Sequence, residues 1–211
     1  MAKKTKKRSF FNRILPFLFI GGIVYAFLNS NLIGDGINID LPNNQDRLSS
    51  HVLQYEEEVT AYAEEEGIED HVDTLLALMM QESGGRGDDP MQASESLCGS
   101  VGCIDDADRS IEQGVTYFAQ TLEQADYDEK LALQSYNFGS GFIDYVKDNG
   151  GEYTQDLAIE FSQLKYEELA HTGDYSCLRA EAEQYDACYG DIYYVDAVLG
   201  YKEAVSQQKS A

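Results

Sequence analysis

Basic residues are scarce in this sequence of 211 residues once the first 13 have passed. The chain has 15 lysines and arginines against 38 acidic residues, and every acidic residue lies after Gly34. Residues 35–211 therefore hold nine basic and 38 acidic side chains, a formal charge of −29. Because no basic stripe is present to neutralise phosphates, nucleic-acid binding is excluded. Most of this charge is typical of a solvated surface.

Histidine is also rare, which limits the chemistry available. The three histidines, His51, His71 and His171, are too far apart in sequence to form a metal-ligand spacing. No cysteine and histidine are arranged as in papain-type peptidases. We therefore expect neither a metal nor a cofactor. The sequence also lacks internal repeats and low-complexity tracts.

Only four cysteines are present, in two close pairs, Cys98 with Cys103 and Cys177 with Cys188. In an exported chain this number predicts two disulfides, although four cysteines allow three different pairings. Zinc binding is the alternative, but these spacings differ from the usual short ligand pairs. The first pair would close the loop that follows Met91 and Gln92.

One segment near the N-terminus, residues 14–34, carries no charge and is strongly apolar. About 20 helical residues cross a hydrocarbon core of ~30 Å. The basic residues before it should stay inside the cell, so we predict a cytoplasmic tail at 1–13, a transmembrane signal anchor at 14–34, and the remainder outside. Cleavage as a signal peptide, giving a secreted protein, is the alternative. Residues 26–31 form a poor small-x-small cleavage site, and no cysteine follows to indicate a lipoprotein.

Beyond the anchor, residues 35–50 contain Gly, Pro and Asn and read as a linker to a single domain at 51–206. The apolar periodicity predicts helices over 51–66, 70–83, 128–139, 142–147, 154–170 and 192–205. Ser110 and Gln113 have the spacing of a capping box, which predicts a helix from Ser110. Residues 84–109 lack periodicity and are expected to form a long loop with a short hairpin, and loops of that length are usually functional. The fold class is mainly α with a small irregular or β element.

Glu82 lies at the end of an apolar helical face. Leu75 and Met79 belong to that face, and Glu82 continues it before Gly84 and Gly85 end the helix. Desolvation and the negative end of the helix dipole both favour a protonated carboxyl at this place. A neutral carboxylic acid near pH 7 is what a general acid for glycoside cleavage must be. A partly exposed glutamate at a frayed helix end is the alternative.

Four short motifs appear in a fixed order along the chain. They are Gln81-Glu82-Ser83-Gly84, then Asp89-Pro90-Met91-Gln92 with Ser94-Glu95-Ser96, then Gln134-Ser135-Tyr136-Asn137-Phe138-Gly139, and finally Tyr193-Tyr194-Val195. This order resembles the lytic transglycosylase and goose-type lysozyme superfamily. The residues within these motifs resemble more closely still the lysozyme-like muramidase domain of cell-wall hydrolases carried by conjugative elements of Gram-positive bacteria. The resemblance covers roughly residues 52–205 and implies a lysozyme-like, mainly helical (α+β) fold with a catalytic cleft.

The resemblance also implies roles for individual residues. Glu82 matches the catalytic acid, and the hydroxyl of Tyr194 is expected to approach it. The residues expected to bind substrate are Ser83, Gln92, Ser94, Glu95, Tyr136, Asn137 and Tyr194. Without the motif order, the two tyrosines would read as core aromatics. The implied substrate is the β-1,4 bond between N-acetylmuramic acid and N-acetylglucosamine in peptidoglycan. Since peptidoglycan is itself anionic, recognition must come from hydrogen bonds and stacking in a groove.

The type of product depends on a second carboxylate. The candidates are Asp88, Asp89, Glu95, Asp105 and Asp106, none of which the spacing singles out. If none acts, the resemblance implies a lytic transglycosylase that closes a 1,6-anhydro ring. If one positions water, the enzyme is a hydrolytic muramidase, which we favour. The rival class is a non-catalytic, membrane-tethered peptidoglycan-binding scaffold. A conjugation or secretion apparatus is the partner that the resemblance suggests.

Overall fold

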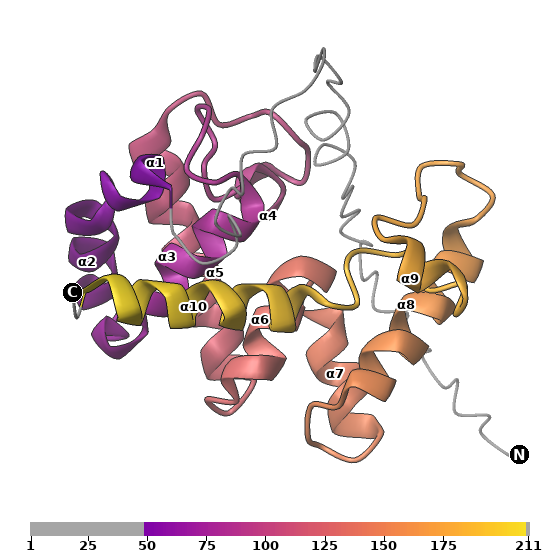
Figure 1. Ribbon diagram of the computed structural model, residues 1–211. Coiled ribbons are helices and arrows are strands. Elements are labelled where there is room, and N and C mark those ends of the chain that lie inside the picture. Colours follow the sequence, from indigo (N-terminus) through magenta and orange to yellow (C-terminus); the bar gives the residue numbers. More distant parts are fainter. Residues whose placement is uncertain (1–48, 210–211) are drawn as a thin grey trace, which may run out of the picture.

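The computed structural model describes residues 49–209 as one helical body (Figure 1). The predicted tail, anchor and most of the linker therefore lie outside the described residues. Within 49–209 there is no strand, and no helix has the length and apolar character of a membrane span. The expected mainly helical class is confirmed. The expected hairpin between residues 84 and 109 is replaced by loop and a short helix, α4 (Ser94–Cys98).

The first elements pack around the helix that ends at Glu82. They are α1 (Ser50–Leu53), α2 (Glu56–Glu65), a 3₁₀ turn (Glu69–His71) and α3 (Val72–Glu82). The single helix expected over 51–66 is thus interrupted at Gln54 and Tyr55. Every residue of α3 from Thr74 to Met79 is buried, so this helix runs through the core.

The last helix, α10 (Tyr194–Lys209), crosses the molecule and packs mainly against α3 and also against α6 (Figure 1). Its start, Tyr194, therefore comes close to the end of α3. Glu129, at the start of α6, links α3 to α10 at a second place. Its Oε1 accepts from Thr74 Oγ1 of α3 at 2.6 Å and from Lys202 Nζ of α10 at 2.7 Å. His71 Nδ1 lies 3.3 Å from the same oxygen.

The helix after the loop, α5 (Ala107–Gln124), begins earlier than expected. Its N-cap is Asp106, whose carboxylate accepts from the backbone N–H of Asp108. The predicted capping box at Ser110 is therefore wrong. Ser110 lies within the first turns, is buried, and uses its hydroxyl for contacts with Asp89 and Met91.

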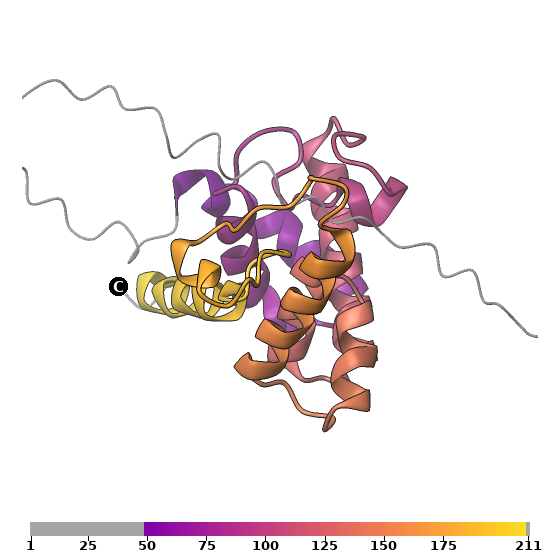
Figure 2. The ribbon, with the colours of Figure 1, turned by 90° about the vertical axis from the view of Figure 1, so that its right-hand side faces the viewer.

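The remaining elements form the other side of the molecule (Figures 1 and 2). They are α6 (Glu129–Phe138), α7 (Gly141–Asp148), α8 (Gln155–Leu169) and the short α9 (Ala180–Glu183). The helices expected over 128–139 and 154–170 are confirmed as α6 and α8, and their N-caps, Asp128 and Thr154, accept from backbone N–H groups of the first turn. Rings of Phe138, Phe142 and Phe161 meet between these helices at centroid distances of 5.2–5.6 Å. The α9 helix was not expected.

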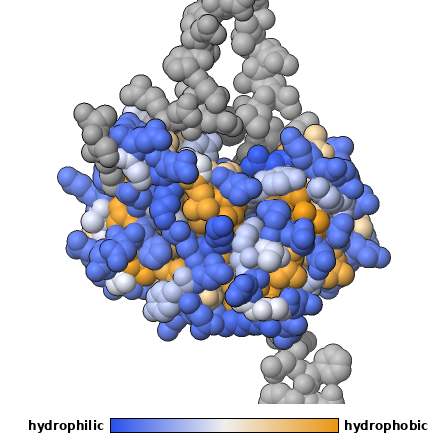
Figure 3. Space-filling view, turned by 60° about the horizontal axis from the view of Figure 1, so that its bottom comes forward, coloured by the Kyte–Doolittle hydropathy of each residue, from blue (hydrophilic) through white to orange (hydrophobic). Residues whose placement is uncertain are grey.

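The surface agrees with the composition. On the face shown in Figure 3, hydrophilic residues surround separate apolar patches. Such a surface is typical of a solvated domain, and it offers no basic field to attract an anionic polymer.

Candidate active site

The end of α3 has the geometry that the two glycines suggested. Gly84 and Gly85 adopt φ values of 65° and 74°, and the N–H of Gly84 donates to the carbonyl of Met79 at 3.1 Å. A helix that ends in left-handed residues in this way satisfies its last carbonyls. A Cβ on Gly85 would lie 2.6 Å from the backbone of His51, so this position also requires glycine for close packing against α1.

Glu82 and Tyr194 meet where α3 and α10 cross. The Tyr194 hydroxyl donates to Glu82 Oε1 at 2.5 Å, and Tyr194 is only 2% exposed. Glu82 is half-buried, at the surface of the core to which Leu75 and Met79 belong. The aromatic hydroxyl therefore fixes the orientation of the carboxyl.

Burial controls the ionisation of Glu82. Desolvation raises the pKa of its carboxyl from 4.5 to about 7, and the hydrogen bond from Tyr194 opposes part of this rise. The nearby carboxylates Asp89, Asp191 and Glu95 contribute smaller parts of this rise, since each repels a negative charge on Glu82. A large share of the molecules therefore keep Glu82 protonated at neutral pH.

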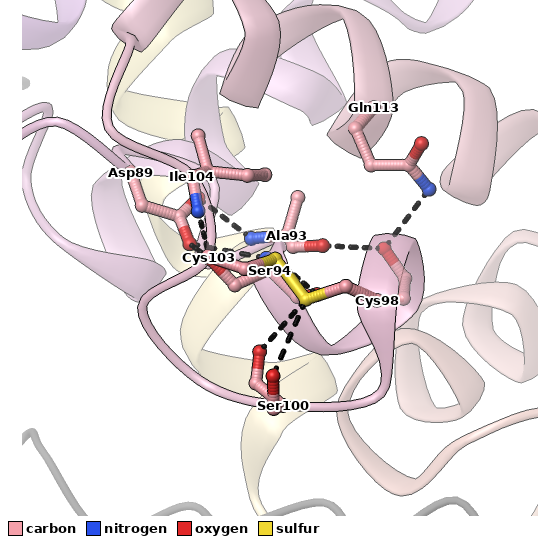
Figure 4. Close-up of a disulfide and its surroundings, with 9 residues drawn as sticks. Asp89, Ala93, Ser94, Cys98, Ser100, Cys103, Ile104 and Gln113 are labelled. Atoms are coloured by element: carbon pink, nitrogen blue, oxygen red, sulfur yellow. Dashed lines mark hydrogen bonds between the residues drawn. A yellow bond between two sulfur atoms is a disulfide. The ribbon is translucent and has the colours of Figure 1, made fainter.

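Asp89 organises the loop that follows α3 (Figure 4). Its Oδ1 accepts from the N–H of Ala93 at 2.8 Å and from Ser110 Oγ at 2.6 Å. Its Oδ2 accepts from the N–H and the hydroxyl of Ser94, at 3.0 and 2.6 Å. The carboxylate is thus held by four donors, and it joins Ala93 and Ser94 of the loop to Ser110 of α5.

The Met91-Gln92 turn is held from several sides. Met91 is fully buried, and the hydroxyl of Tyr136 donates to its carbonyl at 2.8 Å. Gln92 adopts φ 48°, a left-handed conformation that is uncommon for a residue with a side chain, and its Nε2 donates to the carbonyl of Asp89 at 2.8 Å. Gly114 of α5 lies directly beneath, where a Cβ would come 2.6 Å from that of Met91.

The two serines expected to bind substrate, Ser83 and Ser94, have hydroxyls that already form hydrogen bonds within the protein. Ser83 Oγ donates to the carbonyl of Pro90 and accepts from the N–H groups of Gly85 and Arg86. Ser94 is buried, and its Oγ donates to Asp89 and accepts from the N–H of Ile104. Both hold the loop in place, so their direct contact with substrate stays a prediction.

The other residues expected to bind substrate come from different elements. Tyr136 and Asn137 lie on α6, Gln92 in the turn and Glu95 on the first turn of α4. Glu95 and Tyr136 are close enough for electrostatic interaction with Glu82. Asn137 Oδ1 accepts from the backbone N–H of Asp191 at 2.8 Å.

Asp191 is a member of this site that the motifs did not indicate. It is buried, it acts electrostatically on Glu82, and Arg179 forms a bidentate ion pair with it. No spacing in the sequence pairs these two residues, because the contact forms only when the segment before α10 folds back.

Both predicted disulfides are confirmed, with the pairings Cys98–Cys103 and Cys177–Cys188. The first closes the loop between α4 and Ile104, next to Ser94 (Figure 4). The second joins the segment before α9 to the segment that leads to α10.

Comparison with known proteins places the chain in a family. The Lysozyme-like family model matches residues 49–202, so the chain belongs to the lysozyme-like family. It is 46% identical to the bifunctional muramidase/DL-endopeptidase CwlT of Bacillus subtilis over 66% of this chain. It is 35% identical to the uncharacterized membrane protein YocA of the same organism over 88% of this chain. The expected resemblance to muramidase-type members of the family is confirmed.

A solved structure is also similar to this chain in both fold and sequence. The chain has a TM-score of 0.62 and 35% identity with a protein from Staphylococcus aureus described as similar to a lipoprotein of the NLP/P60 family, over 74% of this chain. The chain spans 38% of the length of CwlT, 53% of that solved chain and 81% of YocA.

Proposed function

We propose that this protein is a glycosidase that cleaves the glycan strands of peptidoglycan at the β-1,4 bond between N-acetylmuramic acid and N-acetylglucosamine. Glu82 is the general acid. The observation that carries this proposal is the contact between the Tyr194 hydroxyl and a Glu82 carboxyl whose pKa is raised to about 7. Membership of the lysozyme-like family and the similarity to CwlT support it.

The geometry suits one proton transfer in particular. Tyr194 donates to Oε1 of Glu82, so Oε2 is the oxygen that carries the acidic proton to the leaving glycosidic oxygen. As the proton departs, the carboxylate gains negative charge, and the hydrogen bond from Tyr194 becomes stronger because its acceptor is now ionised. The tyrosine therefore stabilises Glu82 more in the transition state than in the ground state, as catalysis requires.

We propose hydrolysis, with Glu95 as the second carboxylate. Three carboxylates act on Glu82, namely Asp89, Asp191 and Glu95. Asp89 is held by four donors and Asp191 by Arg179, so both serve the scaffold. Glu95 lies on the first turn of α4 and is half-buried. It would take a proton from water as that water attacks the anomeric carbon.

Substrate binding is assigned to the residues around the acid, above all Gln92, Asn137 and Glu95, which are partly exposed. Tyr136 supports the turn from beneath through its bond to the Met91 carbonyl. The acidic surface gives no long-range attraction to peptidoglycan, so binding rests on short-range hydrogen bonds in this region.

We further propose that the domain acts at the outer face of the cell membrane, held by the anchor at residues 14–34. The relative YocA, described as a membrane protein, supports this placement. Association with a conjugation or secretion apparatus stays a prediction.

Mass spectrometry of the muropeptides that the full chain releases from purified peptidoglycan tests the function. We expect disaccharide products with ordinary reducing ends, and none from Glu82→Gln. Products lighter by one water would show 1,6-anhydro rings and overturn the role of Glu95 in favour of a lytic transglycosylase. If neither protein released products while both bound peptidoglycan, the protein would be a scaffold.

A further inference from the structure

Arg179 and Asp191 form an ion pair next to the proposed acid that no motif includes. Arg179 Nε lies 2.9 Å from both oxygens of Asp191, and a terminal nitrogen lies 2.7 Å from Oδ2. The Asp191 side chain is 7% exposed and that of Arg179 37%. A bidentate contact of this kind holds a carboxylate in one orientation.

Asp191 in turn fixes the start of α10. Its Oδ1 accepts from the N–H of Tyr193 at 2.9 Å, and its carbonyl accepts from the N–H of Tyr194 at 3.1 Å. From α6, Asn137 accepts the N–H of Asp191 and Gln134 donates to its carbonyl at 2.9 Å. Every one of these bonds acts on the backbone that places the Tyr194 ring.

Asp191 also acts on Glu82 through its charge. It is one of the carboxylates whose negative charge disfavours ionisation of Glu82, and it acts in the same way on Tyr194. The guanidinium of Arg179 offsets that charge at close range. The pair therefore acts on the site in two ways. Its hydrogen bonds hold the backbone that places Tyr194, and its charges change the electrostatic potential at Glu82.

We propose that Arg179 is a positioning residue that acts through Asp191, holding Tyr194 against Glu82 and offsetting the negative field of Asp191 at the acid. The inference rests on the proposed role of Glu82. Arg179 is the N-cap residue of α9 and lies between Cys177 and Cys188 in sequence. The disulfide-closed segment thus carries a part of the active site rather than being a surface insertion.

The other groups that face Glu82 come from several elements and stay unchanged in the test. They are Tyr194 of α10, Asp89 of the loop, Glu95 of α4 and Tyr136 of α6. A change in the titration of Glu82 on substitution at 179 or 191 therefore reports on the ion pair.

The experiment is a titration of Glu82 in the full chain, labelled with ¹³C at the glutamate carboxyl and assigned with Glu82→Gln. Arg179→Gln leaves the charge of Asp191 unopposed, so the pKa of Glu82 should rise. Asp191→Asn keeps an acceptor for Tyr193 but leaves the charge of Arg179 unopposed, so the pKa should fall. The double variant should titrate between the two single variants, because it removes both charges and their effects on Glu82 have opposite signs.

A purely structural pair would not produce shifts of opposite sign in the two single variants. Arg179→Lys provides a second check, because it keeps the charge and loses the bidentate contact. It should leave the titration nearly unchanged while lowering kcat about tenfold, with KM within about twofold, since the acid is less well oriented. Arg109→Gln, at an exposed position on α5, is the matched control and should change neither quantity.

Titrations of Glu82 that are the same in the wild type, Arg179→Gln and Asp191→Asn would overturn the proposal, as would shifts of one sign in both single variants. The titration needs no substrate, so it can be read even if Glu82→Gln keeps full activity. In that case the proposed function fails, while the positioning of Tyr194 and Glu82 by the ion pair is still decided.

Discussion

The hydroxyl of Tyr194 donates to Oε1 of Glu82 at 2.5 Å, although the two residues lie 112 positions apart in sequence. The contact joins the end of α3 to the start of α10, the pair of helices that pack most extensively against each other. Since both helix ends are fixed by capping and by neighbouring backbone, the carboxyl is held in one place before any substrate binds. This is the preorganisation that acid catalysis needs.

Tyr194→Phe removes that hydrogen bond while keeping the ring. Because the bond lowers the pKa of Glu82, its loss should raise the pKa above about 7. Activity requires the protonated acid, so the decline of kcat/KM at high pH should begin at a higher pH, with a maximal rate lowered about 10- to 100-fold. Tyr127→Phe, at a 70% exposed position, is the control. An unshifted alkaline limb would show that the contact does not control Glu82.

Glu82→Gln should stabilise the fold at high pH. The pKa of Glu82 is about 7 in the folded state and near 4.5 when unfolded, so its contribution to stability is present below pH 4.5 and is lost as pH rises through 7. At pH 8 the ionised carboxyl costs about 3 kcal/mol relative to its protonated form. Urea unfolding of both proteins at pH 5 and pH 8 measures this. Equal stability differences at the two pH values would contradict the raised pKa.

Gly114→Ala should disturb the Met91-Gln92 turn. The new methyl group would lie within 3.0 Å of three side-chain atoms of Met91, which is itself fully buried. Overpacking of this kind costs about 1–3 kcal/mol and should lower activity by moving Gln92. Gly200→Ala in α10, where nothing lies within 4 Å, is the matched control and should gain about 0.5–1 kcal/mol. Thermal unfolding of both variants tests the difference, and equal effects would contradict it.

Glu129→Gln should weaken the contact among α3, α6 and α10. Glu129 is held by Thr74, Lys202 and His71, which lower the pKa of its carboxyl against the opposing effect of burial. Its stabilisation is therefore present above the unfolded pKa and lost as pH falls. We expect a loss of about 1–3 kcal/mol at pH 7 that shrinks in acid. Glu168→Gln, in an exposed pair with Lys165, should cost less than about 0.5 kcal/mol. A cost for Glu129→Gln that is independent of pH would contradict this.

Local sequence signals predicted the helices well where the cap and the helix are neighbours in sequence. The helices predicted to start at 128 and 154 are present as α6 and α8, and Asp128 and Thr154 cap them by satisfying N–H groups two or three residues ahead. The prediction that Ser110 starts the helix was wrong because its hydrogen-bond partner is distant in sequence. Its hydroxyl bonds to Asp89, 21 residues earlier, which no local pattern can reveal, and Asp106 takes the cap instead.

The residues of the candidate site likewise fall into those that the motifs indicated and those that only the folded structure brings together. The motif order pointed to Glu82, Tyr136 and Tyr194, which the fold brings together. Ser83 and Ser94 were predicted to bind substrate, and Asp89 was one of five candidates for the second carboxylate. Their side chains form hydrogen bonds within the protein, and substrate contact by the serines stays a prediction. Arg179 could not be found, since its partner Asp191 is 12 residues away, between a disulfide and a helix start, with no periodicity to connect them.

The most direct test of the central claim measures the soluble muropeptides released from purified peptidoglycan. It compares the wild type with Glu82→Gln after circular dichroism has shown that both proteins are folded. Glu65→Gln, at an exposed position on α2, serves as the control. The account predicts no release by Glu82→Gln, full release by the control, and cosedimentation of all three proteins with peptidoglycan. Undiminished release by the folded Glu82→Gln protein would contradict the assignment of Glu82 as the acid.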